Sequence, residues 1–267
     1  MLKDITLGQY FPGDTVVHRL DPRTKLLLLI VYIVALFLCR WFVSYALMLA
    51  FLVTAIVLSH TRFQALVRGL KPLLIVMIFT ALLNLFYTDG QVLVQFWIFR
   101  ITLEGLRNAF FLLLRILMLV IGTFLLTYTT SPIALTDALE SLLSPLKKIR
   151  FPVHELAMMM SIALRFIPAL IEETDKIISA QKARGADFET GNVFRRAKAL
   201  VPILVPLFVS AFRRADDLAT AMECRCYHGG EGRTKLKQLR FAARDILTLL
   251  LGAVVLAGVI VLRSFGL

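Results

Sequence analysis

The sequence predicts an all-α, polytopic membrane protein with about five transmembrane helices and a cytoplasmic or interfacial domain of about three long helices. Two observations carry this prediction. Apolar residues make up 58% of the 267 residues, and the mean hydropathy is +0.79, so a soluble core of this size could not bury them. Lys and Arg outnumber Asp and Glu by 30 to 18, and the basic residues gather between the apolar runs.

The same composition excludes several other classes of protein. Disordered chains are poor in Leu, Phe and other large apolar residues. Three cysteines without framework spacing do not make a disulfide scaffold. A nucleic-acid-binding protein would not need this much apolar surface, so we expect the lipid bilayer, and no nucleic acid, as the surroundings of the chain.

Five apolar runs are the expected membrane spans. They cover residues 26–39, 42–58, 73–87, 109–127 and 246–262. Several are shorter than the ~20 residues that cross a bilayer core upright, and we expect flanking Lys25, Arg40 and Lys71 to snorkel and make up the length. With a cytoplasmic N-terminus, 25 basic residues lie inside and only four outside, which is the orientation that the positive-inside rule predicts.

Residues 128–245 are highly charged yet have a helical pattern through most of their length. We expect helices at 132–145, 152–185 and 193–227, the last bent at Pro202 and Pro206. The predicted organisation is a four-helix transmembrane region at 1–127, a cytoplasmic helical domain at 128–245 and a C-terminal transmembrane helix at 246–267.

Two apolar stretches within this domain, 156–171 and 199–212, could instead be a further pair of spans. That arrangement would export the connection 172–198 with its six basic residues, against the positive-inside rule. We therefore favour helices that lie at or below the membrane surface. Such helices need a cover other than water, so we expect partner proteins there.

A weak internal repeat relates two of these helices at an offset of 41 residues, which pairs Arg184 with Arg225. Each arginine ends a helix. One such arginine would merely complement the helix dipole, but two copies with small neighbours favour docking on two similar partners, since Arg stays charged and grips carboxylates. The candidate docking residues are Ala183, Arg184, Gly185, Cys224, Arg225 and Cys226.

Segments along nearly the whole chain resemble the transmembrane T component of energy-coupling factor (ECF) vitamin transporters. These segments are Leu20-Asp21-Pro22-Arg23-Thr24-Lys25, Thr130-Ser131-Pro132, Arg165-Phe166-Ile167-Pro168, Gln181-Lys182-Ala183-Arg184-Gly185-Ala186 and Ala221-Met222-Glu223-Cys224-Arg225-Cys226-Tyr227. The second arginine motif often has Ala or Ser before the arginine, so Cys224 is a small departure.

The resemblance implies a multi-pass protein of the bacterial cell membrane that links two ABC-type ATPases to a substrate-binding membrane S component. It implies that Arg184 and Arg225 insert into grooves on the two ATPases, which use ATP and Mg²⁺, and that this chain binds no cofactor directly. ATP-driven closure of the ATPases would move the two helices and drive vitamin or micronutrient uptake. Met158, Met159 and Met160 are candidate contacts of the S component, because unbranched Met suits a surface that repacks; helix packing is the alternative.

Other chemistry has little support in the sequence. No Gly-Lys pair occurs, so there is no P-loop for ATP. Cys224, Cys226 and His228 stand at alternate positions that do not converge on a helix, so we predict no metal site. An intramembrane enzyme acting on lipids or phosphates is the alternative function, but it would need a nucleophile or metal cluster that the sequence lacks.

Arg115 falls within the fourth apolar run, where a charge costs roughly 2.5–3.5 kcal/mol. It therefore needs a partner inside the bundle, and Asn84 is one candidate. We predict a structural brace, with contact to a partner subunit or a lipid headgroup as the alternative.

Overall fold

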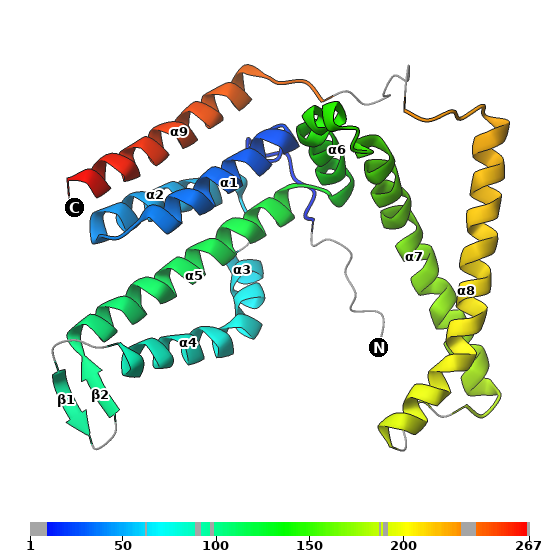
Figure 1. Cartoon of the computed structure of the whole chain (residues 1–267), viewed down its shortest axis with the longest axis horizontal. Coiled ribbons are helices and arrows are strands. Elements are labelled where there is room, and N and C mark those ends of the chain that lie inside the picture. Colours follow the sequence, from blue (N-terminus) through cyan, green and yellow to red (C-terminus); the bar gives the residue numbers. More distant parts are fainter. Residues whose placement is uncertain are drawn as a thin grey trace. The chain divides into compact units, whose positions relative to one another are not determined.

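The computed structural model describes residues 10–61, 63–88, 92–96, 99–186, 188, 192–230 and 239–265, and these are almost wholly helical (Figure 1). The predicted all-α class is therefore confirmed. The helices are α1 (Pro22–Leu38), α2 (Phe42–Ser59), α3 (Phe63–Leu70), α4 (Leu74–Tyr87), α5 (Leu103–Thr129), α6 (Pro132–Leu143), α7 (Val153–Ala183), α8 (Val193–Cys224) and α9 (Ala243–Ser264). Short 3-10 turns precede α4 (Lys71–Leu73) and follow α6 (Ser144–Ile149).

A small antiparallel hairpin joins α4 to α5. Its strands are β1 (Val92–Phe96) and β2 (Phe99–Thr102), with Gln95 opposite Arg100. From the sequence we expect only that the segment 91–100, which contains Trp97, lies at the outer membrane interface. Trp97 itself lies outside the described residues.

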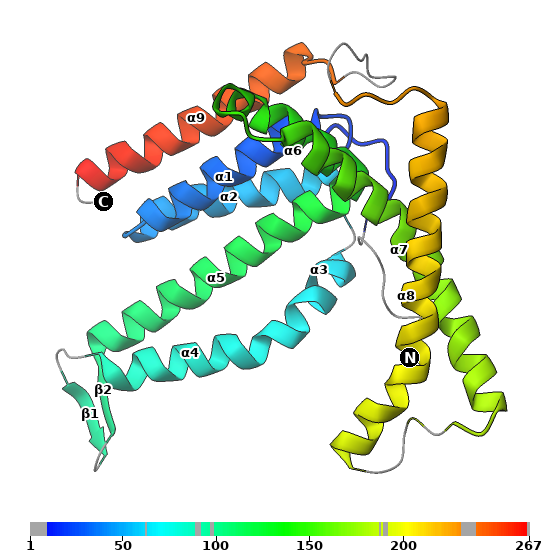
Figure 2. The ribbon, with the colours of Figure 1, turned by 45° about the vertical axis from the view of Figure 1, so that its right-hand side comes forward.

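The described residues form two compact units. The bundle unit combines residues 8–138 with residues 239–267, so that α9 packs beside α1 and α2 although most of the chain separates them in sequence. Figures 1 and 2 both show α9 running alongside these helices. The hairpin unit, within residues 139–238, consists of the end of α6, the following 3-10 turn, α7 and α8.

Five described helical stretches are long and apolar enough to cross a membrane. They are α2, the α3–α4 stretch Gln64–Phe86, α5, α7 and α9. The predicted number is therefore confirmed, but the set differs. Helix α1 is not in it, although its 17 residues lie at the short end of the roughly 17–25 that cross a bilayer and α2 has only one residue more. The 31-residue α7 takes its place in the set.

Helix α1 lies at the centre of the bundle unit. Its Tyr32 and Leu36 are buried against Met48 of α2, Met118 of α5 and Val259 of α9. The Tyr32 hydroxyl donates to the Met118 carbonyl at 3.1 Å, so the one polar atom of that ring is satisfied inside the core.

A buried polar cluster joins the starts of α1 and α9 to the end of α5. The Asp245 carboxylate accepts the amide N–H of Asp21 and that of Ala242, both at 2.8 Å. Lys25 is only 7% exposed, and its ammonium donates to the Thr129 carbonyl at 2.8 Å. The prediction that Lys25 snorkels is therefore wrong, because backbone carbonyls inside the bundle satisfy its charge.

Replacing Asp245 should destabilise the bundle unit. Asp245→Ala leaves the buried Asp21 amide without its acceptor, so we expect a loss of about 1–3 kcal/mol and a clearly lower melting temperature in detergent. Asp245→Asn, which keeps one side-chain oxygen, should lose less. The matched control is Asp14→Ala, at an exposed aspartate of the same unit; equal melting temperatures for Asp245→Ala and Asp14→Ala would contradict this role.

Candidate functional site

Helices α7 and α8 pack against each other in antiparallel directions (Figure 2). The Arg214 guanidinium donates to the Glu173 carboxylate at 2.7 Å, and the Gln181 amide donates to the Pro202 carbonyl at 3.4 Å. Residue numbers rise along α7 between these two contacts and fall along α8, which fixes the antiparallel direction. Helix α8 continues unbroken through Pro202 and Pro206.

We call the helix end formed by Ala183, Arg184 and Gly185 the first tip. It ends α7 in a Schellman motif, a hydrogen-bonded cap at the C-terminus of a helix. Arg184 is the C-cap residue. The Gly185 amide donates to the Lys182 carbonyl and the Ala186 amide to the Gln181 carbonyl, both at 3.0 Å. Gly185 has φ +86°, a left-handed conformation that glycine adopts without a Cβ penalty.

We call the helix end formed by Cys224, Arg225 and Cys226 the second tip. It ends α8 in the same motif. The Cys226 amide donates to the Glu223 carbonyl at 2.8 Å, and the Tyr227 amide donates to the Met222 carbonyl at 3.1 Å. Cys226 has φ +52°, which is uncommon for a residue other than glycine. The sequence reasoning missed that Cys226 takes the position of Gly185, although the offset of 41 residues pairs the two.

Both arginines therefore occupy the same position in the same capping motif. Arg184, Arg225 and their four predicted neighbours are all exposed, and Cys224 and Cys226 are free thiols. Within the described part of the chain, neither the Arg184 nor the Arg225 guanidinium has an ion pair or side-chain hydrogen bond. Each tip thus presents an exposed positive charge at the end of a helix.

The pair that holds the two helices together is related by the same repeat. Glu173 and Arg214 are 41 residues apart, and each lies 11 residues before the arginine that ends its own helix. Because the helices are antiparallel, the two tips point away from this contact in opposite directions, each about 16 Å along its helix. The sequence suggests pairing of Glu173 within its own helix or domain, and Arg214 is the partner found.

Helices α7 and α8 also expose apolar stripes. On α7, Met159 is 54% and Met160 38% exposed, while Met158 is half-buried. On α8 the exposed side chains recur at helical spacing on one face. The side chains of this stripe are Val201, Leu204, Val205, Phe208 and Phe212, and Phe194, Leu200 and Val209 are exposed as well. Apolar surface of this extent marks a place where a partner or lipid binds.

Arg115 on α5 is bonded within the bundle unit. Its Nε donates to the Tyr45 hydroxyl at 2.9 Å and its Nη2 to the Cys39 carbonyl at 3.1 Å, and its guanidinium stacks over Phe37 at 5.7 Å. Asn84 is not its partner, since that amide donates to the Thr80 carbonyl of its own helix. The guanidinium thus connects α5 to the junction of α1 and α2.

Of the three residues considered for a metal site, His228 has a contact with the backbone. His228 Nδ1 lies 2.8 Å from the Cys226 carbonyl. Among the residues that the structure describes, no group of three or more His, Cys, Asp or Glu side chains could hold a metal ion.

Known proteins resemble this chain over nearly its whole length. The family model described as "Cobalt transport protein" matches residues 13–236. A relative from Thermosediminibacter oceani is 53% identical over 262 residues, which are 98% of this chain and 99% of the relative. A relative from Clostridium kluyveri is 55% identical over 92% of both chains, and one from Bacillus subtilis is 48% identical over 97% of this chain and 98% of its own.

All three relatives carry the same name, energy-coupling factor transporter transmembrane protein EcfT. Such a protein is a transport subunit and not a catalytic enzyme, which agrees with the absence of a P-loop from the sequence. The chain therefore belongs to the family of transmembrane components of energy-coupling factor transporters, as its sequence motifs predict.

Proposed function

We propose that this chain is the coupling subunit of an ECF-type ABC importer, transmitting ATP-driven motions of two ATPase subunits to a substrate-binding S component during vitamin or micronutrient uptake. The observation that carries this proposal is the equivalence of the two arginine tips: both arginines are exposed, and both occupy the same position of the same capping motif. Two equivalent tips would fit two partner subunits that share one fold. The alternative, an intramembrane enzyme, is not favoured by any observation on the described residues.

Each tip docks on one ATPase. The chain turns away directly after each arginine, because Gly185 and Cys226 adopt left-handed conformations, so the helix end can enter a groove without a following helical turn. A guanidinium at that end pairs with carboxylates in a fixed, forked geometry. ATP and Mg²⁺ belong to the ATPases in this proposal, and this chain binds neither.

The Glu173–Arg214 contact is the pivot of the coupling movement. When ATP closes the ATPase dimer, the two tips follow their grooves, and the helices turn about the contact that they share. Their apolar stripes, including Met159 and Met160, then shift against the S component. Unbranched methionines repack without a strong rotamer penalty, which suits a surface that changes partners.

The N-terminus and the hairpin unit lie on the cytoplasmic side in this proposal, with domains at 1–127, 128–245 and 246–267. The distribution of Lys and Arg supports this orientation. ATPases that use cytoplasmic ATP must meet both tips on that side of the membrane.

Reversing the charge of the tips should abolish coupling. Arg184→Glu and Arg225→Glu each place a negative charge where a carboxylate is expected, so each variant should lose at least nine tenths of ATP-driven uptake and co-purify poorly with the ATPases, while membrane insertion is unchanged. The matched control is Arg213→Glu, an exposed arginine on α8, which should keep most activity. Full transport by the double tip variant would refute the docking assignment.

The pivot can be tested by exchanging its charges. Glu173→Arg or Arg214→Glu alone places like charges opposite each other where an ion pair of 2.7 Å now lies, so uptake should fall severalfold. The combined exchange restores an ion pair and should recover at least half of the wild-type uptake rate. A double variant no better than either single variant would exclude the pivot.

Labelling of the native cysteines tests on which side of the membrane the second tip lies. Cys224 and Cys226 flank the second tip and are exposed, whereas Cys39 is only 1% exposed. A membrane-impermeant maleimide should therefore label the chain in inside-out vesicles and leave it unlabelled in right-side-out vesicles. The variant Cys224→Ser/Cys226→Ser should stay unlabelled in both. Labelling of the wild type in right-side-out vesicles would place the tip on the wrong side.

A further inference from the structure

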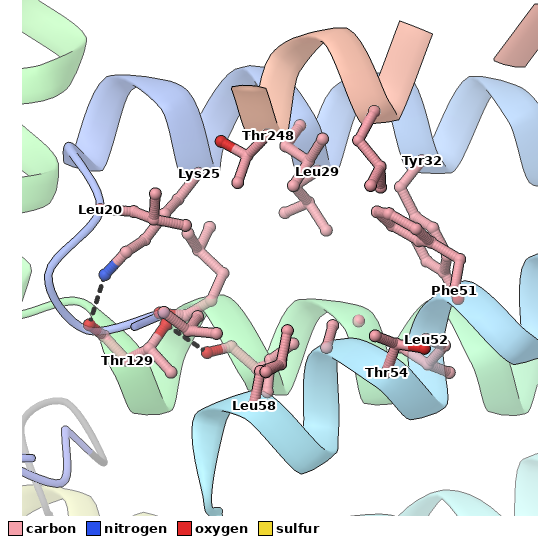
Figure 3. A pocket seen from close by; sticks show the side chains of 17 residues that line it. Leu20, Lys25, Leu29, Tyr32, Phe51, Leu52, Thr54, Leu58, Thr129 and Thr248 are labelled. Atoms are coloured by element: carbon pink, nitrogen blue, oxygen red, sulfur yellow. Dashed lines mark hydrogen bonds between the residues drawn. The ribbon is translucent and has the colours of Figure 1, made fainter. Parts of the chain in front are cut away.

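A cavity of about 200 Å³ lies in the bundle unit among α1, α2, α5 and α9 (Figure 3). It extends along α1 from Lys25 to Tyr32, about 10 Å of helix, and is partly open. Figure 3 shows Leu20 and Lys25 at one end, and Tyr32 and Phe51 at the other. The space is therefore elongated along the helices.

The described walls of the cavity have almost no polar group that could bind water. Four polar side chains reach the cavity lining besides Tyr32, and all are engaged elsewhere. The hydroxyls of Thr54, Thr129 and Thr248 donate to carbonyls three or four residues earlier in their own helices. The Lys25 ammonium donates to the Thr129 carbonyl. An ordered water needs two to four polar partners, so this cavity favours an apolar occupant.

We propose that the cavity binds one acyl chain of a membrane lipid. Dry apolar cavities of about 150 Å³ accept molecules as large as benzene, and the elongated shape suits an unbranched chain better than a compact ligand. Three of the four surrounding helices, α2, α5 and α9, are long and apolar enough to cross the membrane. Lipid is therefore the apolar molecule that surrounds these helices.

The occupant is recognised by its chain and not by its headgroup. Among the described lining residues, Lys25 alone carries a charge, and its ammonium also lies 3.3 Å from the His18 carbonyl and the Thr130 hydroxyl. These three acceptors occupy the three N–H groups of the ammonium. Lys25 therefore has no donor left to bind a lipid phosphate. Lipids with different headgroups should therefore occupy the cavity alike.

The test uses the full-length chain in lipid nanodiscs with a phospholipid that carries a photoactivatable diazirine on one acyl chain. Illumination followed by peptide mapping should place label on Leu29, Leu125 or Leu126, which line the cavity. In Ala55→Phe, the added ring fills the cavity, and label at these residues should fall at least fivefold. Val53→Phe is the matched control, two residues away on α2, outside the lining and 48% exposed, and should label as the wild type does.

A second variant guards against misfolding. Ala55→Leu adds less volume, and its labelling should fall between those of the wild type and Ala55→Phe, with an unchanged melting temperature. Native mass spectrometry of the wild type in mild detergent should find one retained lipid, irrespective of headgroup, that Ala55→Phe lacks. Equal lipid retention by both, or equal labelling of Ala55→Phe and Val53→Phe, would overturn the proposal, as would label confined to outward-facing residues.

Discussion

The bundle unit depends on the buried carboxylate of Asp245. This side chain stands at the start of α9 and accepts the amide N–H of Asp21, 224 residues earlier, just before α1 begins. A buried charge is stable only when hydrogen bonds satisfy it, and the amides of Asp21 and Ala242 do so here. The first and last helices of the unit are thereby held together, although the whole hairpin unit lies between them in sequence.

The same cluster defines where the hairpin unit is attached. Lys25 binds the carbonyl of Thr129, at the end of α5, and the chain leaves the bundle unit through α6 shortly afterwards. It returns just before Asp245. Both connections therefore start from one rigid, hydrogen-bonded cluster. In the proposed coupling role, such a base resists displacement, so movement of α7 and α8 is more readily passed to a partner than lost in deforming the bundle.

The sequence predicts the elements well and their tertiary contacts poorly. Apolar periodicity, Pro132 and Gly185 locate the long helices to within about four residues of their observed ends, except that α5 begins six residues before the predicted run. The inward turn of Lys25 could not be predicted, since a lysine flanking an apolar run has the same pattern whether it snorkels or binds carbonyls inside. The contact of Glu173 with Arg214 required the helix packing itself, although the offset of 41 residues contained the signal.

The two tips are alike in geometry but differ in what stabilises them. Gly185 adopts its left-handed conformation at no steric cost, whereas Cys226 pays roughly 1–2 kcal/mol for a similar one. The cap of α8 therefore depends on contacts beyond its own sequence. One such contact lies where the chain after α8 returns to the start of α7. Gly230 lies so close to the His154 ring that a Cβ at position 230 would collide with it. The His154 Nδ1 in turn lies 3.0 Å from the Glu140 carboxylate. The first tip needs no such support, whereas a strained conformation such as that of Cys226 persists only where the surrounding structure stabilises it.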